Sequence, residues 1–126
     1  MPETRTFPLA DVLSVTTPLL LSARKVDGLT DLLDWMTGDR LELWQLPRAA
    51  DEARPVLIEQ HPFLADLQPP AGLGLIALHA WLVTAIIKQG GNLTISPLTN
   101  WVHQDPIQEF MDRVELAKLG TTGGTP

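Results

Sequence analysis

The stretch "AGLGLIALHAWLVTAIIKQGG" (residues 71–91) decides the fold, because it holds no Asp, Glu, Lys or Arg before Lys88. A segment of this kind is a membrane span, a core helix or a surface for a partner. Its charge-free part, residues 71–87, is at the short end of a span and contains two glycines and a histidine. Gly90-Gly91 then ends it, with no basic cluster to orient an insertion. We therefore expect a central helix of a soluble protein and no membrane span.

Placed at 100° steps, the side chains of this helix sort by size. Large residues fill about half of the circumference and are expected to face the core: Leu75, Ile76, Leu78, Leu82, Val83, Ile86 and Ile87. The opposite half of the circumference carries small side chains, with one tryptophan among them. Because neither half is polar, the helix predicts a homodimer or larger homo-oligomer. The expected interface consists of Gly74, Ala77, Ala80, Trp81 and Thr84.

The rest of the chain predicts further helices, each with a recognisable start or end. Pro8 and Pro47 suit first helical turns, Gly38 suits a left-handed helix end, and Asp105 with Pro106 starts the last helix. Residues 40–46 are compatible with a short strand or a helical turn, and residues 92–98 with one strand. The predicted fold is mainly α, four to five helices with at most a small β element. It forms a single compact α+β domain over 1–119, with a linker near 66–72 and a disordered tail at 120–126.

The amino-acid composition limits the classes of function that the protein could have. The 126-residue chain is 44% hydrophobic and 19% charged, which is typical of one globular domain. It has no cysteine, so thiolate metal sites and cysteine nucleophiles are excluded. A net charge of −6 disfavours nucleic acid and favours a basic protein partner. No export signal opens the chain, so we expect a cytoplasmic protein.

Catalytic patterns are absent from the sequence. His61, His79 and His103 are too far apart for two ligands on one helix face. We expect His61 to cap a helix end and His79 to lie in the core. His103 with Asp105 indicates either helix capping or a contact patch. No phosphate-cradling glycine loop occurs. The expectation is a protein that is not an enzyme and has no metal and no cofactor.

Several short motifs resemble a known family. Met36–Asp39 (MTGD), Gln45–Arg48 (QLPR), His61-Pro62, Trp101 and Asp105–Ile107 (DPI) lie in an order similar to that of small uncharacterised proteins encoded by bacteriophages and prophages. Trp44 and Ala53 depart from that pattern, where a small polar residue or histidine and a cysteine are usual. The resemblance implies a phage accessory protein, and such proteins often block host defence systems in the way anti-CRISPR proteins do.

The motif regions also supply candidate contact residues. Tryptophan and arginine dominate many interfaces, because each combines a large area with a polar group. The expected site for a host protein comprises Trp44, Arg48, Asp51, Trp101, His103 and Asp105. Under a purely structural alternative, Arg48 pairs with Asp51 or Glu52 and the tryptophans are buried. Two other functions stay open: an oligomer that holds a signalling nucleotide with Arg48 and Arg54, and a virion or assembly protein.

Overall fold

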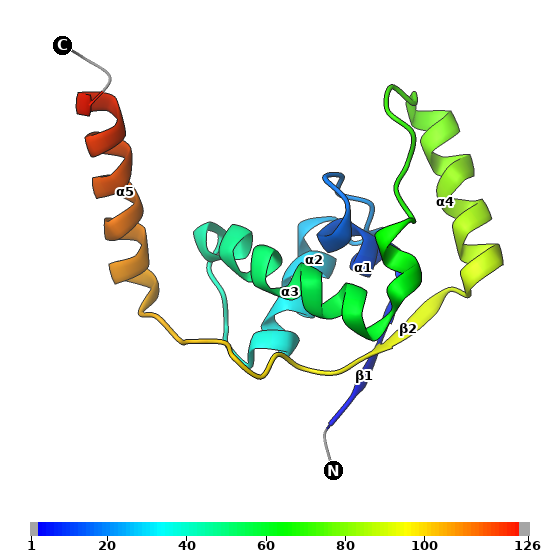
Figure 1. Cartoon of the computed structure of the whole chain (residues 1–126), viewed down its shortest axis with the longest axis horizontal. Coiled ribbons are helices and arrows are strands. Elements are labelled where there is room, and N and C mark those ends of the chain that lie inside the picture. The colour runs from blue at the N-terminus through cyan, green and yellow to red at the C-terminus, as the bar shows by residue number, and fades with distance from the viewer. Residues whose placement is uncertain (1–2, 124–126) are drawn as a thin grey trace.

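Helices dominate the structure, a computed structural model that describes residues 3–123, with side chains through residue 115. Helices α1, α2 and α3 pack at the centre, while α4 and α5 lie on opposite sides of them (Figure 1). A two-stranded antiparallel sheet, β1–β2, lies beside the core. The predicted mainly α fold with a small β element is confirmed. The elements are β1 (Arg5–Pro8), α1 (Leu9–Thr16), α2 (Val26–Thr37), the 3-10 turn η1 (Leu43–Gln45), α3 (Leu46–Gln60), the 3-10 turn η2 (Pro62–Ala65), α4 (Leu75–Gln89), β2 (Asn92–Ile95) and α5 (Pro106–Gly123).

The centre of the core is α1, not the helix of residues 71–91 that the sequence predicted to be central. Almost every side chain of α1 is buried, because α2, α3, η2 and the sheet surround this short helix. Pro8, which the sequence predicted to lie in the first helical turn, is instead the last residue of β1 and directly precedes the helix, with φ −58° and ψ 142°. Apolar residues from α2, α3 and the sheet complete the core, with Leu32, Leu33, Met36, Ala53, Leu57 and Ile95 all nearly inaccessible.

Local signals set the helix ends. Gly38 follows α2 with φ 74°, and its N–H donates to the Asp34 carbonyl, which is the predicted left-handed end. The α2 helix starts at Val26, with Asp27 in its first turn, where an acidic side chain is favourable to the helix dipole. Of the two possibilities for residues 40–46, the structure has the helical turn η1, where the Glu42 N–H donates to the Gln45 side chain.

Strand β2 joins the C-terminal half of the chain to the core. It pairs with β1 so that Phe7 lies opposite Leu93 and Arg5 opposite Ile95. The end of α3 holds the outer side of β2, because the Gln60 amide exchanges two hydrogen bonds with the Ser96 backbone (2.9 and 3.1 Å). His61, which ends α3 as predicted, contacts the Thr94 carbonyl at 2.7 Å.

A buried polar cluster between α1 and α2 was not predicted. The Asp11 carboxylate is only 1% exposed and accepts hydrogen bonds from Ser22 Oγ and from the Arg24 guanidinium. Gly28 of α2 packs directly on this cluster. A Cβ atom there would lie 2.1 Å from Ser22 Oγ and 2.8 Å from Asp11 Oδ1. The cluster therefore requires glycine at this position of α2.

Helix α4 faces the core with a narrow stripe instead of its whole bulky half. The prediction for this helix is wrong in detail: Leu75, Ile76 and Ile87 are 84%, 88% and 79% exposed. His79, expected in the core, is exposed as well. The side chains that do approach the core mix large and small residues: Leu78, Trp81, Leu82, Ala85 and Ile86. No helix within residues 3–123 combines the length and the apolar character needed to cross a bilayer.

Helix α5 begins as predicted, with the Asp105 carboxylate accepting the N–H groups of Ile107 and Gln108. The Gln108 side chain does not complete a capping box, since it donates to Asp112 instead. The helix continues to Gly123, so it overlaps the tail predicted to be disordered (120–126), and residues 124–126 lie outside the described residues.

Candidate protein-interaction site

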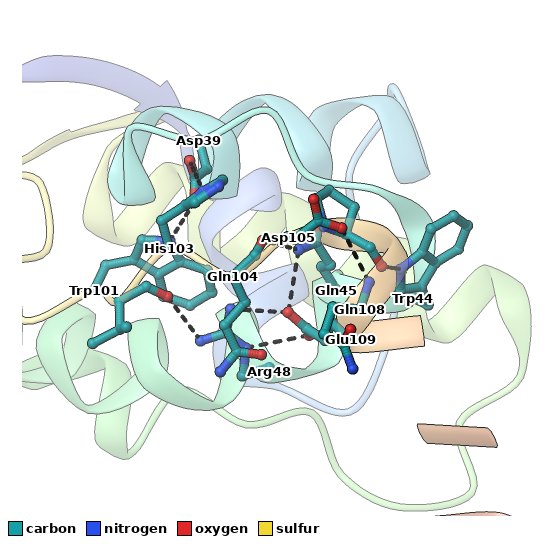
Figure 2. Close-up of polar contacts among 12 residues, drawn as sticks. Asp39, Trp44, Gln45, Arg48, Trp101, His103, Gln104, Asp105, Gln108 and Glu109 are labelled. Carbon is teal, nitrogen blue, oxygen red and sulfur yellow. Dashed lines mark hydrogen bonds and ion pairs between the residues drawn. The ribbon is translucent and has the colours of Figure 1, made fainter. Parts of the chain in front are cut away.

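Two segments that lie far apart in the sequence, η1 with the start of α3 and the connection leading into α5, meet around Arg48. Arg48 Nη2 and Nε donate to the Glu109 carboxylate at 3.0 and 3.3 Å. Gln45 Nε2 donates to the same carboxylate at 3.2 Å. Glu109 is only 5% exposed although it carries a charge. This ion pair therefore attaches the first turns of α5 to the core (Figure 2).

The opposite side of Arg48 is covered by Trp101, so that Figure 2 shows the guanidinium between an indole and a carboxylate. The Arg48 Cζ atom lies 3.9 Å from the centre of the Trp101 ring, which is a cation–π contact. Trp101 Nε1 donates to Asp39 at 2.6 Å, and His103 Nδ1 lies 2.8 Å from the other Asp39 oxygen. We call Asp39, Gln45, Arg48, Trp101, His103 and Glu109 the Arg48 cluster.

Trp44 makes a second attachment beside the Arg48 cluster. Its Nε1 donates to the Pro106 carbonyl at 2.8 Å, and its ring lies 5.2 Å from that of Phe110. All four tryptophans are half-buried, and Trp35, Trp81 and Trp101 pack against the core. The tryptophans therefore hold elements together as well as presenting an edge to solvent.

Five of the six predicted contact residues come together in this region. Trp44, Arg48, Trp101, His103 and Asp105 all help to position α5 or the segment before it. The sixth, Asp51, is exposed on the next turn of α3 and pairs with Arg54 at 3.1 Å. Arg48 does contact Glu52, at 3.4 Å, as the structural alternative required.

Sequence reasoning missed the centre of this cluster. The sequence motifs contain Asp39 and Gln45 without indicating a contact for either, and no sequence pattern indicates a role for Glu109. Glu109 lies on the side of the helix opposite the apolar stripe of Ile107, Phe110, Met111 and Val114. That stripe remains largely uncovered, since Ile107 and Met111 are 72% and 55% exposed.

The outward surface around the cluster is apolar. Arg48 pairs with Glu109, and Asp39 is engaged by Trp101 and His103, so little polar capacity is left for a small anion. Exposed apolar side chains surround them, and we call this set the apolar rim: Leu43, Val102, Ile107, Phe110 and Met111. Groups of exposed apolar side chains of this kind are common at protein interfaces.

Hydrogen bonding shifts two carboxyl pKa values of the cluster. Burial alone would raise the pKa of Asp39, but hydrogen bonds from Trp101 and His103 outweigh burial and lower it. Burial likewise opposes the lowering at Glu109, where Arg48 and Gln45 hold the pKa below its ordinary value. A carboxyl group whose pKa is lower in the folded protein than in the unfolded chain stabilises the fold at pH values above its ordinary pKa of about 4. This stabilisation is lost as the pH falls through the pKa of the folded protein.

Acid is therefore expected to loosen the cluster before the core. Below about pH 4, the Trp101 indole N–H resonance should move away from its neutral-pH position, while that of Trp81 on α4 stays in place. The measurement is a pH series of two-dimensional NMR spectra, with the Trp101→Phe protein identifying the resonance. Burial raises the pKa of Asp34, so global stability has an opposing contribution, and a local probe is needed. A Trp101 signal that stays fixed until the whole protein unfolds would contradict this expectation.

The predicted oligomer interface on α4 is mostly on the surface. Gly74, Ala77, Ala80 and Thr84 are exposed, whereas Trp81 is half-buried and packs against the core. The exposed seam of this helix instead runs through Ile76, Ala80, Val83 and Ile87, at spacings of four, three and four residues. This spacing is typical of a helix that packs on another helix.

The described residues hold no group of metal ligands, and the part of the chain around the core matches a family model. Within the described residues, no three side chains of His, Cys, Asp or Glu come together as metal ligands would. No curated protein and no solved structure matches the chain. Residues 7–67, which run from β1 to just beyond η2, match the family model of a domain of unknown function (DUF7736).

Proposed function

We propose that the protein is a phage-encoded, non-enzymatic inhibitor that binds a host defence protein in the bacterial cytoplasm by protein–protein contact. The observation that carries the proposal is the amount of large apolar surface left uncovered on α4 and on the apolar rim. Isolated exposed apolar residues are ordinary, but groups of them on one element mark interaction surfaces. The motif resemblance supplies the phage setting, and the net charge of −6 favours a basic target.

The apolar rim is the proposed contact surface for the host protein. The Arg48 cluster and Trp44 attach the start of α5 to the core, so the rim residues of α5 lie on an anchored helix rather than on a free segment. The other two rim residues, Leu43 and Val102, lie in η1 and in the connection before α5. Rigid apolar anchors surrounded by polar groups are a common form of binding site. The sequence-predicted residues Trp44, Arg48 and Trp101 then act by positioning this surface.

The experiment is a plating assay in bacteria that each carry one defence system. The protein should raise the plating efficiency of a sensitive phage in at least one strain. Ile107→Asp on the rim should abolish the effect, and Ala23→Asp, which adds the same charge at another exposed residue, should not. Protection that survives Ile107→Asp would remove the rim from the proposal, and no effect in any strain would overturn the function itself.

The nucleotide-binding alternative is disfavoured because both arginines that it requires are already paired with carboxylates. Arg48 is engaged by Glu109 and Glu52, and Arg54 by Asp51 and the Val15 carbonyl. A phosphate group placed there would meet these carboxylates as well as the two arginines. Calorimetry with a panel of signalling nucleotides is expected to show no binding. An assembly role stays possible and would be detected by association with virion proteins instead of a host protein.

Self-association through α4 is the second part of the proposal. Light scattering should show a dimer or larger assembly for the unmodified protein, because a second copy would cover Ile76, Val83 and Ile87, a face free of acidic residues. Ala80→Arg should give a monomer by placing a charge in the seam, whereas Ala23→Arg should leave the assembly intact. A monomeric unmodified protein would contradict the expectation.

A further inference from the structure

A groove runs along the outer face of α3, beside the Arg48 cluster. It consists of two adjoining hollows between α3 and residues 96–101, with volumes of about 320 and 480 Å³. The hollows share Val56, Thr99 and Asn100, and Trp101 closes one end. Its length along α3, from Asp51 to Glu59, is about 12 Å at 1.5 Å per residue. An extended peptide segment of about four residues spans that distance.

The groove has an apolar floor and an acidic edge. Pro55, Val56 and Leu98 line the floor. Three exposed carboxylates, those of Asp51, Glu52 and Glu59, lie along α3 at its edge. Asp51 pairs with Arg54 in an exposed contact of the kind that is worth little. Glu52 lies 3.4 Å from Arg48, whose guanidinium is held more closely by Glu109. Glu59 forms no ion pair with any residue that the structure describes.

Pro55 adds a backbone acceptor to the same surface. Proline has no N–H, so it cannot donate to the carbonyl of Asp51, four residues earlier in α3. That carbonyl oxygen is therefore left without its helical donor at a point where Pro55 and Asp51 both line the groove. The carbonyl and the three carboxylates are all hydrogen-bond acceptors, so the edge is complementary to N–H donors that carry positive charge.

We propose that this groove binds a short basic, partly apolar segment of the protein partner. Lysine or arginine side chains of the segment lie along the acidic edge of α3, and an apolar side chain lies between Val56 and Leu98 against Trp101. The inference rests on the proposed function and specifies its partner: a protein with an exposed basic segment, the part that a nucleic-acid-binding protein would use for phosphates. Three carboxylates in one groove repel nucleic acid itself.

The test uses the full chain and a fluorescein-labelled peptide of about six residues that alternates lysine and leucine. The same peptide with glutamate in place of lysine is the charge control. The basic peptide should bind and the acidic one should not. Glu59→Lys should weaken binding by about tenfold without a change in Tm, because it replaces an attraction by a repulsion. Asp27→Lys on α2 makes the same charge change at an exposed residue outside the groove and should alter affinity less than twofold.

The outcomes separate the two proposals. Equal losses of peptide affinity for Glu59→Lys and Asp27→Lys would show that the peptide is attracted by net charge alone, and this result would overturn the proposed groove site. Equal binding of both peptides would overturn it as well. If a host target is found and Glu59→Lys leaves that interaction unchanged, the groove fails while the proposed function stands. If Glu59-dependent peptide binding is found but no defence system is inhibited, the groove stands and the proposed function fails.

Discussion

Replacing Gly28 by alanine is expected to lower the free energy of unfolding by about 3 kcal/mol, the upper end of the range for overpacking a filled interior. The added methyl group would lie 2.1 Å from Ser22 Oγ, so the hydroxyl has to move. Ser22 cannot move without loosening its hydrogen bond to the buried Asp11 carboxylate. A charged group in a buried place depends on such partners, and losing one adds to the steric cost.

Urea unfolding of the two proteins measures this loss. The matched control is Gly91→Ala, where the new Cβ would meet only Ile86 Cγ2, at an ordinary 3.7 Å. The control should lie within about 0.5 kcal/mol of the unmodified protein. Gly28→Ser or larger changes should be worse than Gly28→Ala. Equal stability of Gly28→Ala and Gly91→Ala would show that Ser22 and Asp11 rearrange freely, and the cluster would lose the role assigned to it.

Replacing Glu109 by alanine is expected to cost about 2–3 kcal/mol and to release the first turns of α5 from the core. Removing one member of a buried ion pair typically costs about 3–5 kcal/mol, because the other charge stays behind without its partner. The cost here is set lower because the Arg48 side chain is 22% exposed and keeps weaker contacts with the Val102 carbonyl and Glu52. Gln45 loses an acceptor at the same time.

The readout has to follow α5 itself, since the core can stay folded when α5 is released. Limited proteolysis between residues 102 and 109 should become faster, and Trp44 fluorescence should shift to longer wavelength as its contacts with Pro106 and Phe110 are lost. Glu115→Ala, the same substitution at an exposed position of the same helix, is the control. If the two variants are cleaved at the same rate, the Arg48–Glu109 pair does not hold α5.

Several helix ends could be predicted from the sequence alone because they depend on the backbone of single residues. Proline fixes its own φ and glycine accepts a positive one, so Pro8, Gly38 and the His61-Pro62 pair act wherever the chain places them. Asp105 caps α5 through N–H groups only two and three residues away. The central part of the fold that these signals outline also falls within the family match at residues 7–67.

Which side of a helix is buried was decided only by the tertiary structure. The size pattern of α4 predicted that its bulky half faces the core, yet the structure turns inward a stripe that includes Trp81 and Ala85. An apolar helix has several faces that could be buried, and the neighbouring elements select one of them. The four-residue strand β1 likewise becomes a strand only by pairing with β2, some 85 residues later in the chain.

The candidate site could likewise be predicted from the sequence only in part. The sequence identified Trp44, Arg48 and Trp101 because these residue types are conspicuous at interfaces. It did not identify Glu109 or Asp39, because an acidic residue on a helix or in a turn is ordinarily solvated. Only the meeting of segments about 60 residues apart provides the arginine, indole and amide donors that allow these carboxylates to be covered. Local backbone chemistry thus set where many of the elements begin and end, while long-range packing decided which charges are buried and which apolar faces are left uncovered.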